Sequence, residues 1–210
     1  MSATRLLVLG VVRGHGRAHG YLVQAELVSW GPEAWANVKW GSLYHALRQM
    51  AKEGLLHATE IADWPGRVDY KMTEAGEAEF LRLLRDALRR PGRPDMLAAG
   101  LALLPALPRA EAFALLKERL TALEADRDDV DAQAHDRGGH AHLRELFDLR
   151  VHTADAAVEW TRGLIERLET GAYVMADEDG RAFGAPGSLV RPERGPAPRS
   201  TPGPRWPNCR

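Results

Sequence analysis

The sequence has a single cysteine and no long apolar run, and each shortage excludes a class of protein. Cys209 is the next-to-last residue, so no internal disulfide can form. No apolar stretch approaches the roughly 18 residues that a bilayer-spanning helix needs. The apolar start runs into Arg13 and His15 without a small-residue cleavage site, so we expect no signal peptide. These shortages together predict a cytoplasmic protein.

The chain also lacks a strong charge of one sign, since its formal net charge is −1. The charge is unevenly spread, however. Residues 1–90 hold 12 Lys and Arg against 10 Asp and Glu, whereas residues 91–176 hold 10 against 15. The mildly basic first part permits a polyanionic partner without requiring one. The hydrophobic share of 45% and the charged share of 27% are ordinary for a soluble globular protein.

The first 90 residues alternate short helical patterns with one hairpin pattern. Apolar residues at positions 6–11 suit a short buried helix, the glycine-rich stretch 14–20 suits a loop, and residues 21–30 suit a second helix. A third helix is predicted to begin near Gly41 and to end before Gly54, where glycine suits a left-handed cap.

A wing and a fourth helix complete this region. Residues 55–61 and 68–72 are two short strand patterns, and the Pro-Gly pair within residues 64–67 suits the centre of a type II turn. Thr73 is the predicted cap of the fourth helix, which continues to Leu88. This order predicts a mainly α fold with a small two-stranded wing, the winged helix-turn-helix layout, in which the third helix enters a major groove of DNA.

The predicted third helix has one apolar face and one face of hydrogen-bond donors. Leu43, Leu47 and Met50 fall at i, i+4 and i+7 and form its core stripe. On the other face arginine can pair with guanine and glutamine with adenine, while the helix N-terminus suits a phosphate. A merely solvated polar face is the alternative, which the surrounding wing and helices disfavour. The predicted DNA contacts of this helix and the wing are Lys39, Ser42, His45, Arg48, Gln49, Lys52, Arg67 and Lys71.

Three motifs in this region resemble the PadR-type regulators. They are the string 41–56, which begins Gly-Ser-Leu-Tyr and ends Glu-Gly-Leu-Leu, the triplet 19–21, and the stretch 70–76, Tyr-Lys-Met-Thr-Glu-Ala-Gly. The resemblance covers about residues 5–90. It implies a winged-helix homodimer, mostly a repressor, whose helical C-terminal part forms the dimer.

The same resemblance assigns roles to particular residues. It implies that Tyr21, Gly41, Ser42 and Tyr44 face the DNA or position the recognition helix. The family usually has proline after this tyrosine, whereas this chain has His45. A side chain that can read a base therefore replaces an inert one, which bears on the preferred sequence.

The second region, residues 91–176, has an almost wholly helical pattern and is predicted to form the dimer. One set of residues there recurs at alternating steps of four and three, a heptad-like seam. An intramolecular helical hairpin uses the same spacing and stays open as the alternative, but operator reading by two half-sites favours a dimer. The seam consists of Phe147, Val151, Ala154, Val158, Thr161, Ile165 and Leu168.

Trp160 lies beside this seam and is the predicted effector-binding residue, because some PadR-type proteins stack flat aromatic compounds at the dimer interface. The alternative is an ordinary core tryptophan. From residue 177 onward, seven prolines and five glycines in 34 residues predict a disordered tail. The sequence thus predicts a winged-helix domain over 1–90, a helical dimerisation region over 91–176 and a tail over 177–210.

Rival interpretations receive little support from the residues. The glycines at 14, 16 and 20 are spaced one residue too far apart for a dinucleotide fingerprint, and no second strand with an acidic end follows. His135, His140, His142 and His152 lack the spacing of a metal site and suit a solvated loop. We therefore predict no enzyme, no cofactor and no metal. Besides a DNA-binding regulator and a small-molecule sensor, the third possible function is a protein-interaction module that has lost DNA binding.

Overall fold

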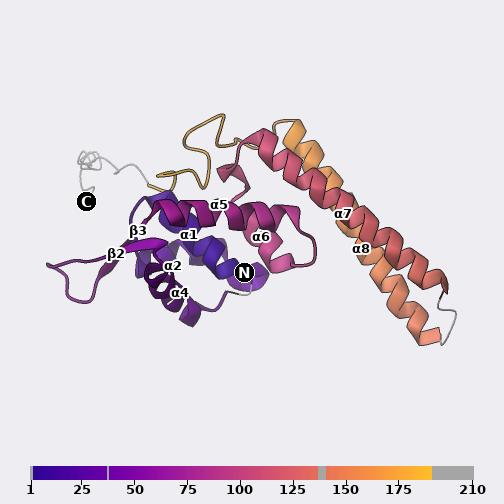
Figure 1. The fold of residues 1–210 in the computed structure, drawn as a ribbon, viewed down its shortest axis with the longest axis horizontal. Coiled ribbons are helices and arrows are strands. Elements are labelled where there is room, and N and C mark those ends of the chain that lie inside the picture. Colours follow the sequence, from indigo (N-terminus) through magenta and orange to yellow (C-terminus); the bar gives the residue numbers. More distant parts are fainter. Residues whose placement is uncertain (1, 37, 137–140, 191–210) are drawn as a thin grey trace, which may run out of the picture.

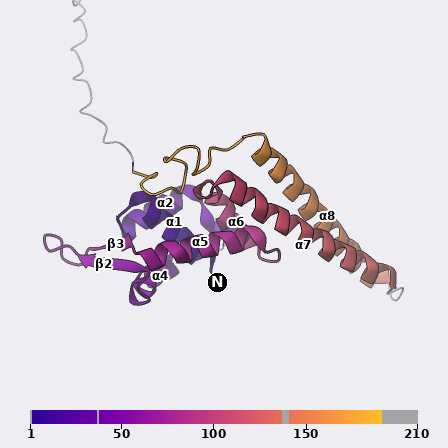
Figure 2. The same cartoon turned by 45° about the horizontal axis from the view of Figure 1, so that its top comes forward.

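The computed structural model describes residues 2–36, 38–136 and 141–190. A helical unit with a projecting wing occupies one end, and a long helical hairpin extends from the other (Figure 1). The hairpin still stands clear of that unit when the molecule is turned (Figure 2). This arrangement matches the predicted mainly α fold with a small wing.

The winged-helix unit contains six helices and three strands within the described ranges. Its elements are α1 (Ala3–His15), β1 (Ala18–His19), α2 (Gly20–Trp30), α3 (Pro32–Ala36), α4 (Trp40–Lys52), β2 (Leu56–Glu60), β3 (Val68–Met72), α5 (Glu74–Arg89) and α6 (Pro94–Ala102).

Helix α1 is the centre of the core. Helices α2, α4, α5 and α6 and strand β3 all pack against it. Its apolar run from Leu6 to Val12 has no exposed large side chain, which agrees with the prediction of a helix buried on most sides. Gly10 admits the side chain of Leu103, since a Cβ there would lie 2.6 Å from a leucine methyl carbon. The sequence predicted too short a helix because only its apolar middle carries a pattern.

The wing has the predicted strands and turn, with one strand more than expected. Gly66 has φ of 83°, and the Arg67 N–H donates to the Trp64 carbonyl at 3.0 Å, as a type II turn requires. Strand β1 comes from the stretch predicted as a loop and pairs with β3, so that the sheet order is β1-β3-β2. Two residues are too short to show an alternating pattern, which is why β1 could not be predicted from the sequence.

The predicted start of the fourth helix is confirmed, whereas the region does not end where expected. The Gly76 N–H donates to Thr73 Oγ1 at 3.0 Å, a side-chain cap at the start of α5. Helix α6 then packs against α1, α3 and α5. The first core therefore continues past the predicted boundary at residue 90.

The helical hairpin consists of α7 (Arg109–Asp136) and α8 (Ala141–Glu169), which follow the short 3-10 turn Leu104–Ala106. The two helices pack along each other, and Arg162 forms an ion pair with Glu124 across them. The heptad-like seam of α8 is buried here: Val158 is 2% exposed and Leu168 is fully buried. The prediction of this seam as the dimer contact is therefore wrong, because the intramolecular hairpin uses it.

The seam residues differ in how deeply they lie. Phe147, Thr161 and Ile165 are also buried, while Val151 and Ala154 are half-buried. Leu116, Leu123 and Val130 are the buried apolar residues that α7 contributes at a similar spacing.

The segment after α8 departs from the predicted disorder as far as residue 190. It turns back along the winged-helix unit, where Met175, Ala182 and Ala185 are buried. Its glycines serve turns, as at Gly184 and Gly187, whose φ values are 85° and 77°. The rest of the predicted tail, residues 191–210, lies outside the described residues.

Candidate DNA-binding face

Helix α4 stands with its apolar stripe inward and its donor face outward. Leu43, Leu47 and Met50 are completely buried, as predicted. His45, Arg48 and Lys52 are exposed and make no hydrogen bond or ion pair with another described residue. A row of donors without intramolecular partners is therefore presented along one side of this helix.

Gln49 differs from these three residues because its side chain forms a hydrogen bond within the protein. Its amide donates to Glu53 at 3.0 Å, and Arg5 of α1 holds the same carboxylate at 2.6 Å. The hydrogen bonds of Arg5 and then Gln49 lower the pKa of Glu53 to about 2. The end of α4 is thus fastened to α1, and Gln49 must exchange or share this bond to reach a base.

The start of α4 has open backbone N–H groups. Lys39 occupies the N-cap position without a capping side chain, and the Ser42 hydroxyl donates to its carbonyl at 2.6 Å. Gly41 is exposed, and a Cβ added there would meet nothing within 4 Å. The first turn of α4 is therefore accessible to an anion that approaches its backbone closely.

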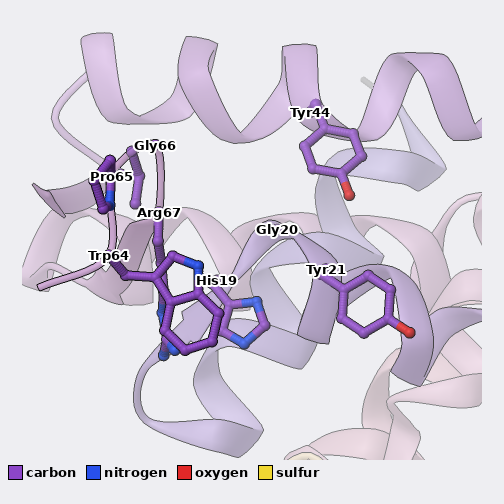
Figure 3. A pocket seen from close by; sticks show the side chains of 9 residues that line it. His19, Gly20, Tyr21, Tyr44, Trp64, Pro65, Gly66 and Arg67 are labelled. Carbon is purple, nitrogen blue, oxygen red and sulfur yellow. The ribbon is translucent and has the colours of Figure 1, made fainter. Parts of the chain in front are cut away.

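Tyr21 of α2 and Tyr44 of α4 border the same cleft (Figure 3). Tyr21 is 72% exposed and Tyr44 is 40% exposed, and the Tyr44 hydroxyl donates to Gln24 at 2.9 Å. The Tyr44 ring rests on Gly20, where a Cβ would lie only 2.5 Å from a ring carbon. Glycine at position 20 thus allows the Tyr44 ring of α4 to pack against α2.

His19 caps α2, a role that the sequence did not reveal. Its Nδ1 accepts the Leu22 N–H at 3.2 Å, so this nitrogen carries no proton. Burial first, and then the nearby charge of Arg67, lower the pKa of His19, which favours that neutral form.

The wing tip carries an aromatic side chain where cations were expected. Arg67 is half-buried, donates to Asp69 at 2.9 Å and lies over the Trp64 ring at 5.9 Å. Its charge is therefore engaged by the wing itself, unlike that of Lys71, which is exposed. Trp64, which was not predicted as a site residue, is 65% exposed at the tip. Its position after strand β2 gave no sign of that exposure.

His19, the two tyrosines and the wing turn border one cleft of about 540 Å³ between helices α2 and α4 and the wing. The wall is formed by His19, Tyr21 and Tyr44 on one side and by the turn from Trp64 to Arg67 on the other (Figure 3). The exposed donors of α4 and the two tyrosines thus share one end of the molecule with the wing.

The family model of the PadR-like transcriptional regulators matches residues 8–82. Over these residues the chain is similar to the PadR-like transcriptional regulators. The match spans α1 through most of α5, so it includes all three motifs from which the resemblance was inferred. The family comprises regulators of transcription and not enzymes. No curated protein matches the chain.

Several solved structures are similar to this chain at low identity. Bacillus subtilis PadR in complex with operator DNA is 19% identical, with 78% of this chain and 98% of that one covered and a TM-score of 0.34. The same protein in complex with p-coumaric acid is 18% identical, with 80% and 99% covered and a TM-score of 0.34. The PadR-like regulator BC1756 from Bacillus cereus is 21% identical, with 80% and 98% covered and a TM-score of 0.33.

The described structure lacks the arrangements that the rival functions would need. The glycine at 14 lies inside helix α1, which is not the strand-and-loop arrangement of a dinucleotide site. Among the described residues, no three His, Cys, Asp or Glu side chains gather to hold a metal ion. The side chains of His135 and His140 lie outside the described residues. Within the described ranges, no helix has the length and hydropathy needed to cross a membrane.

Proposed function

We propose that this protein is a transcriptional regulator that binds DNA sequence-specifically through α4. It works in the cytoplasm as a homodimer on a two-half-site operator, where it acts as a repressor. The observation that carries the proposal is the donor row of His45, Arg48 and Lys52, which is exposed and free of intramolecular partners. Side chains of this kind on a helix that fits the major groove can read base edges directly.

Gly41 gives independent support for DNA binding at the first turn of α4. Glycine in a helix costs about 1 kcal/mol relative to alanine, and the packing of this chain does not require it, since a Cβ would lie in open space. Close approach of a phosphate to the first turn of α4 supplies a reason for its presence. Lys39 and Ser42 stand beside it, and Tyr21, Tyr44 and Lys71 border the same face, so we assign all of them to backbone contacts.

A second copy of this chain is the proposed occupant of an exposed stripe on α8. Leu146 and Leu149 are 50% and 66% exposed, and Trp160 is 41% exposed. Together with Thr153, Ala156 and Gly163 they follow alternating steps of three and four, the spacing of a helix-pairing seam. The hairpin projects from the winged-helix unit (Figure 1), and the exposure of Leu146, Leu149 and Trp160 shows that no described part of the chain covers them. Pairing two hairpins would bury it.

DNA binding is tested by selecting bound fragments from random duplexes with the purified full-length protein. We expect a preferred two-half-site sequence, with affinity that falls steeply as salt rises because phosphate counterions are released. For six to ten phosphate contacts the loss is about 10³- to 10⁵-fold between 50 and 200 mM salt. Absence of any salt-dependent DNA shift would instead favour the protein-interaction module.

A small-molecule sensor on the same scaffold is the second candidate function. Trp160 borders a shallow cleft of about 600 Å³ with Ala156, Gly163 and Arg167. The cleft lies on the stripe proposed for pairing, so a second copy would enclose it, and a flat aromatic ligand would find both an indole face and a cation there. A ligand that binds one arrangement of the two hairpins better would shift the spacing of the recognition helices.

The sensor is tested by fluorescence quenching with a panel of planar aromatic acids, with and without operator DNA. We expect saturable quenching that Trp160→Phe removes, and weaker binding in the presence of the operator because coupling between two sites is reciprocal. Quenching that persists in Trp160→Phe, or that ignores the operator, would contradict an effector site at Trp160.

A further inference from the structure

Trp64 at the tip of the wing is an aromatic side chain that the rest of the protein leaves largely in water. The residue is 65% exposed, and its indole N–H has no hydrogen-bond partner within the ranges that the structure describes. A tryptophan side chain buries about 150–250 Å² when it packs, so a ring exposed at a turn is unfavourable for the free protein. Tryptophan is enriched at interfaces because it combines a large apolar body with one polar N–H. Trp64 is therefore a candidate contact for a partner molecule.

The wing holds this ring in a defined position. The Trp64 N–H donates to the Ile61 carbonyl, and the Arg67 N–H donates to the Trp64 carbonyl, both at 3.0 Å. The Arg67 guanidinium lies over the indole, 5.9 Å from the ring centre, and donates to Asp69, which is 6% exposed. A side chain that is already held in place loses little conformational entropy when it binds a partner.

The cleft beside Trp64 indicates which part of a DNA duplex the wing would meet. Tyr21 and Tyr44 line one side of this cleft, next to α4, and Trp64 lines the other side (Figure 3). When a helix lies in the major groove, the next features along the duplex are a sugar–phosphate strand and then the minor groove. With α4 in the major groove, the cleft faces that strand. The wing tip then lies at the minor groove.

The charges of the wing tip do not favour a contact with phosphates. The Arg67 guanidinium is paired with Asp69. The neighbouring side chains of Asp63 and Glu60 are exposed carboxylates, which repel a phosphate. What the tip presents to DNA is therefore an apolar ring with one N–H rather than a positive charge. Apolar side chains that enter a minor groove act as wedges, which partly unstack a base step and bend the duplex.

We propose that Trp64 is a specificity-determining residue that enters the minor groove beside each half-site and partly unstacks one base step there. The proposal rests on the proposed DNA binding by α4 and extends it to a base step that α4 does not contact. Pyrimidine–purine steps such as TA and CA deform most easily, so the operator should carry one where the wing lies. The indole N–H can donate to the acceptors that adenine and thymine present in the minor groove.

The test uses four full-length proteins on the selected operator. They are the wild type, Trp64→Ala, Trp64→Phe and the control Val174→Ala, which shortens an apolar side chain that is 57% exposed outside the cleft. One set of duplexes carries 2-aminopurine in place of single adenines along the flanks of the half-sites, because the fluorescence of this base increases when it unstacks. A second set replaces the flanking pyrimidine–purine step by a stiff A-tract step. Circular dichroism verifies that each protein is folded.

We expect the wild type to increase the 2-aminopurine fluorescence at one flanking step of each half-site. Trp64→Ala should lose this signal and bind about tenfold more weakly, since contacts between a base and an aromatic ring contribute on that scale. Trp64→Phe should keep the signal with a smaller loss of affinity, because phenylalanine retains a ring but has no N–H. Replacing the flanking step should weaken binding by the wild type and leave binding by Trp64→Ala almost unaffected. Val174→Ala should match the wild type.

The outcomes separate the insertion of Trp64 from the proposed function. Equal affinity and equal flanking preference in the wild type and Trp64→Ala overturn the insertion while DNA binding by α4 stands. A wild type that binds the operator without any change in 2-aminopurine fluorescence overturns it as well. Loss of a protein–protein contact in Trp64→Ala at full DNA affinity would place Trp64 in a protein interface instead. A wild type that binds none of the duplexes overturns the proposed function itself.

Discussion

Replacing His45, Arg48 and Gln49 together by alanine is expected to abolish the sequence preference of the regulator and to weaken binding to the selected site at least about 100-fold. Each good base contact contributes about 1–3 kcal/mol of discrimination, so Arg48→Ala alone should cost about 10-fold or more. Lys39, Lys52 and the first turn of α4 remain, so weak salt-dependent binding should persist. Competition assays on selected and scrambled duplexes measure both quantities.

The matched control for this triple variant removes an exposed charge elsewhere. Arg144 is exposed on the hairpin, and Arg144→Ala should leave both affinity and preference unchanged. Since Gln49 also holds Glu53, circular dichroism must show that the triple variant remains folded. An unchanged site preference in a folded triple variant would show that α4 does not read the bases.

Placing aspartate at both Leu146 and Leu149 is expected to convert the dimer to a monomer and to reduce operator affinity by about 10²- to 10⁴-fold. Two charges would then face each other across the proposed interface, where desolvation is unfavourable. A monomer cannot make the second half-site interaction, which the dimer makes intramolecularly. Light scattering and DNA binding on the same samples measure the two effects.

Two further variants show which surface of α8 is responsible. His152→Asp adds a charge on a third face of the helix, outside both the exposed stripe and the buried seam, and should leave the dimer intact. Val158→Asp instead places a charge inside the hairpin, where Val158 is 2% exposed, and should lower the helix content and the melting temperature. A dimer that survives both leucine substitutions would exclude the exposed stripe as the interface.

Local features of the DNA-binding unit could be predicted because each depends on a few neighbouring residues. The Pro-Gly turn of the wing, the cap at Thr73 and the inward stripe of α4 follow from turn geometry, a side-chain hydrogen bond and helical period. The same locality explains the agreement between the predicted donor face and the exposed residues His45, Arg48 and Lys52.

Which element packs against each helix face, in contrast, was decided by the tertiary structure alone. A heptad-like spacing is the same whether a helix packs on its own chain or on another, so the seam from Phe147 to Leu168 did not reveal that α7 covers it. The exposed stripe of Leu146, Leu149 and Trp160 became visible only once that seam was occupied. Arg67 was likewise predicted only as a DNA contact, because nothing local indicates that its guanidinium would pair with Asp69.

Residues 173–190, which follow α8, show the same division most clearly. This segment forms no helix or strand, and most of it falls within residues 177–210, whose glycine and proline content led to a prediction of disorder. Its place in the fold depends on main-chain hydrogen bonds to the Arg13 and Gly14 carbonyls and on the gap that Gly14 leaves for Leu189. Such interactions join residues far apart in the chain and use backbone groups that every residue carries. The sequence by itself therefore determined helix α4 and the wing, whereas only the tertiary structure decided what covers each remaining surface.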